Sequence, residues 1–118
     1  MAKSNIQIEV NLDDDKIPES IFWNASDGGD ESQKARAMML AFWDGADKSA
    51  LRVDLWTKEM MVDEMADFFY QTFMTMGDTF KRATNQPELV DDIKNFAKAF
   101  YQKFRETQLK ENKIEGKV

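Results

Sequence analysis

The chain has 118 residues, a formal net charge of −6 and a sequence pI of about 4.7, which is the size of one domain. It contains no cysteine and no histidine, so disulfides, thiolate metal sites and the usual general base at neutral pH are excluded. An acidic chain without a basic patch repels phosphate, so neither nucleic acid nor an anionic membrane surface is an expected partner.

The N-terminal segment alternates between apolar and polar residues. Ile6, Ile8, Val10 and Leu12 fall on one side of this pattern, which predicts a half-buried strand over residues 4–12. The alternation leaves no apolar core for a secretory signal, and no apolar run approaches the ~20 residues of a membrane helix. We therefore expect a cytoplasmic protein without membrane insertion.

Residues 20–25 predict a second strand that forms a hairpin with the first. The acidic run Asp13–Asp15 lies between them and lacks the ligand spacing of a calcium loop, so we expect a solvated turn. The loop of residues 24–31 combines acids and glycines but lacks the phosphate-loop motifs. We expect it to cap a helix, with Asp30 as the N-cap.

The next apolar residues follow a helical spacing. They predict a helix that ends near Gly45, with Ala35, Met38, Met39, Phe42 and Trp43 on one face. Residues 50–57 return to strict alternation and predict a third strand. Two more helical stripes follow, over residues 62–84 and from Pro87 to Phe104, and Pro87 suits the first position of a helix.

This order, strand, strand, helix, strand, helix, helix, predicts an α+β fold. The simplest arrangement that buries the stripes is one small three-stranded sheet, antiparallel or mixed, covered on one face by helices. We expect a single domain over residues 1–107. The polar residues 108–118 are expected to form a frayed C-terminal tail, because they carry no apolar stripe to bury.

The predicted strands place a candidate interaction surface on the sheet face away from the helices. If Leu51 and Leu55 face the helices, Trp56 faces away from them, and Phe22 does the same if Ile21 faces inward. Large aromatic side chains on an otherwise polar face are typical of protein contacts. The candidate protein-interaction residues, which include the corner after the third strand, are Phe22, Arg52, Trp56, Lys58 and Glu59.

The residue types and motifs of the chain give little support for a catalytic function. No serine lies in a Gly-x-Ser-x-Gly motif, and we predict no catalytic, cofactor-binding or metal-binding residue. The leading hypothesis is a non-enzymatic interaction protein, expected to be a homodimer. One alternative is a small-ligand binder or carboxylate-based enzyme, which uses the loop of residues 24–31 or a pocket between helices. Another is a chaperone-like binder of client proteins, because Met and Phe are abundant.

Four segments resemble the gliding motility-associated protein GldC family. They are residues 21–27 (Ile-Phe-Trp-Asn-Ala-Ser-Asp), 41–44 (Ala-Phe-Trp-Asp), 54–65 (Asp-Leu-Trp-Thr-Lys-Glu-Met-Met-Val-Asp-Glu-Met) and 78–85 (Asp-Thr-Phe-Lys-Arg-Ala-Thr-Asn). The resemblance implies a small protein of the Bacteroidetes lineage that assists the gliding machinery, which is linked to a dedicated secretion system. It implies no catalytic residues.

Overall fold

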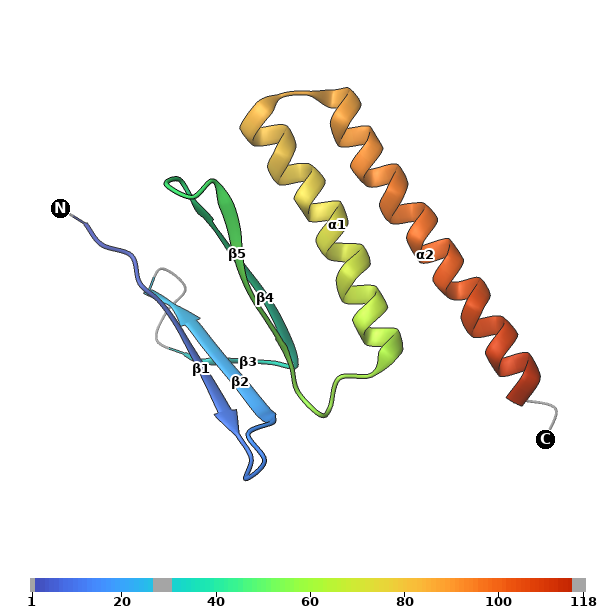
Figure 1. Cartoon of the computed structure of the whole chain (residues 1–118), viewed down its shortest axis with the longest axis horizontal. Helices are drawn as coiled ribbons and strands as arrows, with labels where there is room; N and C mark the ends of the chain where they lie inside the picture. Colours follow the sequence, from blue (N-terminus) through green and yellow to red (C-terminus); the bar gives the residue numbers. More distant parts are fainter. Residues whose placement is uncertain (1, 27–30, 116–118) are drawn as a thin grey trace. The chain divides into compact units, whose positions relative to one another are not determined.

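The computed structural model describes residues 2–26 and 31–115, which form an α+β structure, as predicted. By its internal contacts the chain divides into two compact units, Met1–Met60 with the strands and Met61–Val118 with the helices. The elements, labelled in Figure 1, are β1 (Ile6–Leu12), β2 (Pro18–Ala25), β3 (Gln33–Ala35), β4 (Ala37–Asp44), β5 (Ser49–Trp56), α1 (Val62–Thr84) and α2 (Pro87–Glu115).

The predicted hairpin of the first two strands is confirmed, since β1 and β2 pair antiparallel. The acidic run between them is an ordered turn. Asp13 Oδ1 accepts hydrogen bonds from the backbone N–H groups of Asp15 (2.8 Å) and Ile17 (3.0 Å). Lys16 takes the left-handed conformation, with φ of 64°. A carboxylate that bonds to backbone two residues ahead is a common way to fix a turn.

The first sheet has the strand order β1-β2-β3 and one apolar face. The register sets Val10 and Ala35 on either side of Ile21, which is 1% exposed and forms the centre of this small core. Phe22 lies on the opposite face, between Glu9 and Lys34. Ile21 and Phe22 therefore lie on opposite faces of the sheet, as their alternation predicted.

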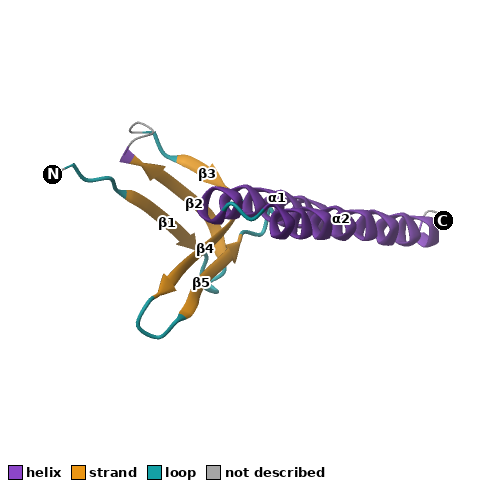
Figure 2. Ribbon diagram, turned by 90° about the horizontal axis from the view of Figure 1, so that it is seen from above, coloured by secondary structure: helices purple, strands orange, loops and turns teal. Residues whose placement is uncertain are grey.

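The helix predicted around residues 35–43 is wrong. These residues form β3 and β4, with a bend at Arg36 between them, and β4 pairs antiparallel with β5 in a separate two-stranded sheet. Figure 2 shows the strands of the two sheets running in different directions. The run Ala37–Trp43 is apolar throughout, and such a run satisfies helical spacing and a strand equally well. The segment forms a strand because its backbone pairs with β5.

Two further details of the predicted fold need correction. The described strands form two sheets of three and two strands, not one sheet of three. Gly45 does not end a helix; it follows Asp44 in the turn between β4 and β5, where Asp44 Oδ1 accepts a hydrogen bond from Ala46 N–H (2.9 Å). The cap predicted at Asp30 lies outside the described residues.

Both C-terminal helices are confirmed, and α2 begins at Pro87 as predicted. The first turn of α1 carries Asp63 and Glu64 and its last turn Lys81 and Arg82, which suits the helix dipole. Asn85 ends α1 in the left-handed conformation, with φ of 53°. The helix α2 extends to Glu115, into the segment expected to be frayed. The domain boundary at residue 107 stays a prediction.

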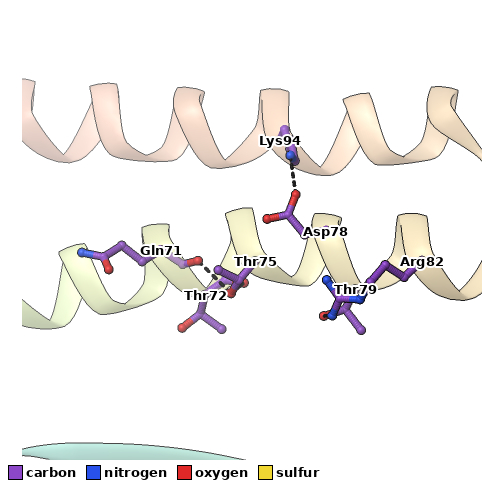
Figure 3. A network of polar contacts seen from close by, with 7 residues as sticks. All are labelled: Gln71, Thr72, Thr75, Asp78, Thr79, Arg82 and Lys94. Carbon is purple, nitrogen blue, oxygen red and sulfur yellow. Dashed lines mark hydrogen bonds and ion pairs between the residues drawn. The ribbon is translucent and has the colours of Figure 1, made fainter.

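Small residues let α1 and α2 pack closely as an antiparallel hairpin. Ala66 and Gly77 of α1 and Ala97 of α2 are buried. An ion pair joins the helices near Gly77: Lys94 Nζ donates to Asp78 Oδ1 over 2.6 Å, and Figure 3 shows the two side chains pointing toward each other. Lys94 lowers the pKa of the Asp78 carboxyl.

Aromatic rings fill the middle of the same helical hairpin. Phe73 of α1 lies between two rings of α2, with its centroid 5.5 Å from Phe96 and 5.5 Å from Phe100, both edge to face. Edge-to-face pairs at this separation add to the burial energy of the rings. Of the stripes predicted as helix core, Phe73 and Phe100 are partly buried between the helices, whereas Phe96 is 58% exposed.

Candidate protein-interaction surface

The hairpin of β4 and β5 has two faces of different chemistry, and its register assigns each residue to one of them. Directly opposed residues of an antiparallel pair share a face. Met38, Leu40 and Phe42 lie opposite Leu55, Val53 and Leu51. We call these six residues the apolar hairpin face. The other face, which we call the tryptophan face, consists of Ala37, Met39, Ala41, Trp43, Ala50, Arg52, Asp54 and Trp56.

The apolar hairpin face is open to solvent along much of its length. Phe42 is 61% exposed, Leu51 54% and Val53 49%. Sequence reasoning missed this surface, because the residues of β4 were assigned to a helix. The available signal was the uninterrupted apolar run before Asp44-Gly45, which is also typical of a strand bounded by a turn.

The tryptophan face brings together two of the predicted interaction residues, Arg52 and Trp56. Arg52 binds Asp54 through two hydrogen bonds, Nε to Oδ2 (3.0 Å) and Nη2 to Oδ1 (2.9 Å). The Asp54 carboxylate raises the pKa of the Arg52 guanidinium. Trp56 is 59% exposed, and Trp43 on the same face is 69% exposed. Two large rings thus flank a fixed pair of opposite charges.

The corner after β5 is anchored by a buried threonine. Thr57 is 3% exposed, and both its N–H (2.8 Å) and its hydroxyl (3.0 Å) donate to the Arg36 carbonyl at the bend between the two sheets. The Glu59 carboxylate lies 3.7 Å from Lys34 Nζ and 3.6 Å from Arg36 Nε. The Glu59 ion pairs therefore connect the corner to β3 and to the bend at Arg36. The Glu59 side chain remains half exposed.

Lys58 pairs with Asp13 in the first hairpin turn. Its ammonium group lowers the pKa of the Asp13 carboxyl, and Asp13 in turn raises the pKa of Lys58, in each case chiefly through their hydrogen bond. Sequence reasoning treated the two residues separately, as an exposed turn and a docking residue. Their contact joins segments that are far apart in the sequence, so no local pattern could reveal it.

Phe22 does not share a sheet with the other candidates. It lies on β2 in the three-stranded sheet, and the register places Trp56 in the two-stranded sheet. The single aromatic sheet face expected from the sequence thus falls on two sheets. Phe22 is also only partly exposed, since Glu9 and Lys34 flank it.

The described surface includes an apolar hollow and a polar one. One, of about 210 Å³ in the strand unit, is lined by apolar side chains of both sheets, Ile6, Ile8, Ile21, Trp23, Ala35, Ala37, Met38 and Met39. The other is shallow and lies at the end of α1, lined by Asp78, Lys81, Arg82 and Asn85. Neither hollow brings two carboxylates together, as the alternative of a carboxylate-based enzyme would require.

The described part of the chain shows neither a metal-ligand cluster nor a membrane-spanning helix. Across residues 2–26 and 31–115, no group of three or more Asp, Glu, His or Cys side chains is placed to hold a metal ion. Neither α1 nor α2, as far as they are described, has the length and apolar character needed to cross a membrane.

Comparison with known proteins gives one result. Residues 18–106 match the family model described as gliding motility-associated protein GldC-like. The match includes β2 to β5, all of α1 and most of α2. No curated protein and no solved structure gives a significant match.

Proposed function

The chain belongs to the gliding motility-associated protein GldC-like family, and on that premise we propose that it is a non-catalytic accessory of the gliding machinery. In this proposal it acts in the cytoplasm of a Bacteroidetes cell, binding protein partners and a second copy of itself. The candidate contact residues remain Arg52, Trp56, Lys58 and Glu59, with Phe22 on the neighbouring sheet.

The exposed apolar hairpin face is the observation that carries the proposal. Soluble monomers rarely leave a contiguous apolar patch open to water, and patches with a polar rim mark interaction sites. Here Phe42, Leu51 and Val53 are each about half exposed or more. The tryptophan face on the other side of the same hairpin supports a binding role, because aromatic and arginine side chains dominate contact energies.

The non-catalytic part of the proposal is supported by the residues available. The chain has no histidine and no cysteine. The apolar hollow of the strand unit is lined by aliphatic and aromatic side chains without a charged group. Acid–base chemistry needs positioned ionisable groups beside a substrate.

Complementation of a deletion strain tests both the motility role and the apolar hairpin face. The gene is deleted in a gliding host, and the deletion strain receives the parent, Leu51→Glu or Leu12→Glu. Leu51 lies on the apolar hairpin face, whereas Leu12 is a similarly exposed leucine (51%) at the end of β1, so the control makes the same substitution elsewhere. We expect the parent and Leu12→Glu to restore cell movement, and Leu51→Glu to fail.

The outcomes separate the two claims. Unchanged gliding in the deletion strain contradicts the motility role. Full restoration by Leu51→Glu contradicts the hairpin as the contact surface while leaving the motility role intact. Immunoblots establish that both variants accumulate to the level of the parent, and cell fractionation of the parent tests the cytoplasmic location.

A further inference from the structure

The strand β5 has an edge that the described chain leaves unpaired. Its only partner among the described strands is β4, in a sheet of two strands. An isolated two-stranded hairpin is marginally stable in water, and three or more strands are usually needed. Exposed edges are commonly protected by charged side chains, proline or a bulge. Ser49–Trp56 contains no proline, its register with β4 is continuous, and its two charged side chains, Arg52 and Asp54, bind each other.

The sequence of β5 is complementary to itself when it is reversed about Val53. An antiparallel copy centred on Val53 places Leu51 opposite Leu55 on the apolar hairpin face. It places Arg52 opposite Asp54 on the tryptophan face. Opposed apolar pairs and opposed opposite charges are the pairs that stabilise antiparallel strands.

The ends of the strand fit the same register. Trp56 then faces Ala50, so the largest side chain of the strand lies opposite one of the smallest, which suits interdigitation at a contact. The strand β4 offers no such match, because Ala37–Asp44 carries a single charge, at its last residue. Self-pairing through β4 would therefore gain no opposed charges.

We propose that the chain dimerises by antiparallel pairing of β5 with β5 of a second copy, with the two-fold axis at Val53. This forms a four-stranded sheet with the order β4-β5-β5-β4. The Arg52–Asp54 ion pairs of the two copies become a cluster of four charges of alternating sign. The inference deepens the proposed function and rests on it, since it names the partner and the register of the hairpin surface.

The centre of symmetry is tested with single cysteines, which is straightforward because the chain has none. In the proposed register, Val53→Cys places two thiols directly opposite each other, within the range that a disulfide bridges. Leu51→Cys is the matched control on the same face of the same strand. Its two thiols lie four residues apart along the paired strands, about 13 Å.

Under mild oxidation we expect Val53→Cys to form a covalent dimer faster than Leu51→Cys, by about tenfold or more, because only the Val53→Cys thiols lie within the reach of a disulfide in the proposed dimer. Equal rates for the two variants, or no covalent dimer from Val53→Cys, overturn the proposed register.

A second experiment uses charge and needs no cysteine. Arg52→Asp sets two acids against two acids in a dimer, and Asp54→Arg sets two arginines against two arginines. By sedimentation we expect each variant alone to have the monomer mass of 13.7 kDa, at a concentration where the parent has twice that mass. When the two variants are mixed, both acids of one chain face the two arginines of the other, so the dimer mass returns.

Recovery on mixing cannot come from the ion pair within one chain, because neither variant can form it. It also excludes misfolding as the cause of the loss, since a misfolded chain is not repaired by its counterpart. A monomeric mixture, a dimeric single variant or a monomeric parent overturns the inference. A monomeric parent also overturns the self-binding part of the proposed function, whereas none of these results decides the gliding complementation, which tests the motility role separately.

Discussion

Thr57 gives two hydrogen bonds to one acceptor, the backbone carbonyl of Arg36, with its N–H at 2.8 Å and its hydroxyl at 3.0 Å. This contact connects the end of β5 to the bend between the two sheets. It therefore fixes the base of the hairpin that carries both candidate contact faces.

We expect Thr57→Val to lower the free energy of unfolding by about 1 kcal/mol, the net value of one such hydrogen bond. The shape of the side chain is nearly kept, and the backbone N–H continues to satisfy the carbonyl. Thr57→Ser keeps the hydroxyl and serves as the control. Urea denaturation measures both, and equal stability of Thr57→Val and the parent would show that the hydroxyl contributes nothing.

The Asp13–Lys58 ion pair is predicted to make the free energy of unfolding depend on pH in the acid range. The folded-state pKa of Asp13 is lowered, so its contribution is fully present above the unfolded pKa of about 3.9. It is lost as the pH falls through the lower folded value. Asp13→Asn should therefore flatten the pH dependence of unfolding below about pH 4.

The control for that prediction is Asp14→Asn, which removes the same charge from the same turn. Thermal unfolding of the parent and both variants is followed from neutral pH into acid. A steeper acid loss in Asp13→Asn than in the parent would contradict the assignment. Lys58 gives the complementary case: its raised pKa implies stability present below about pH 10.5 and lost above it.

Gly77 and Lys94 are predicted to be energetically coupled. A Cβ at Gly77 would lie 3.2 Å from both Cγ and Cε of Lys94, so Gly77→Ala must displace a side chain that is paired with Asp78. Alanine is favoured over glycine in a helix by about 1 kcal/mol. We expect Gly77→Ala to be close to neutral in the parent and to stabilise by about 1 kcal/mol in a Lys94→Ala background.

The coupling is measured as a double-mutant cycle from urea denaturation of the four proteins. Additive effects within about 0.3 kcal/mol would mean that the two side chains do not interfere.

Phe73 is expected to be the most sensitive aromatic position of the helical unit. Its ring contacts those of Phe69, Phe96 and Phe100. Truncating such a ring removes both transfer and packing energy, so Phe73→Ala should cost about 3 kcal/mol. Phe96→Ala, at a position 58% exposed, is the matched comparison and should cost less than half as much. The ranking is checked by denaturant unfolding, and the reverse order would contradict it.

Local sequence patterns predicted much of the fold because they report on local geometry. The alternation of Ile6, Ile8 and Val10 predicted β1, and its pairing with β2 confirms the strand. The predicted burial of its apolar side holds only in part: Val10 lies opposite the buried Ile21, whereas Ile6 is 74% exposed. The stripes of α1 and α2 were long enough to be unambiguous. The run Ala37–Trp43 was not, because a segment that is apolar throughout has no periodicity to read.

The candidate site was predicted in part. Arg52 and Trp56 share a face because alternation along one strand fixes their orientation, and the register with β4 agrees. The apolar hairpin face was missed, since it exists only once Phe42 is set opposite Leu51 across a strand pair. The engagement of Lys58 with Asp13 was missed for the same reason: the two are brought together by the fold.

The sequence by itself determined the α+β class, the absence of histidine and cysteine chemistry, the strands β1, β2 and β5, and both helices. These follow from composition and from periodicities of two and 3.6 residues, which any chain carries along its own length. Only the tertiary structure decided that residues 37–44 are a strand, that the strands form two sheets, and that Thr57 anchors the hairpin. Each of these depends on hydrogen bonds between residues far apart in the chain, and no local pattern specifies such a partner.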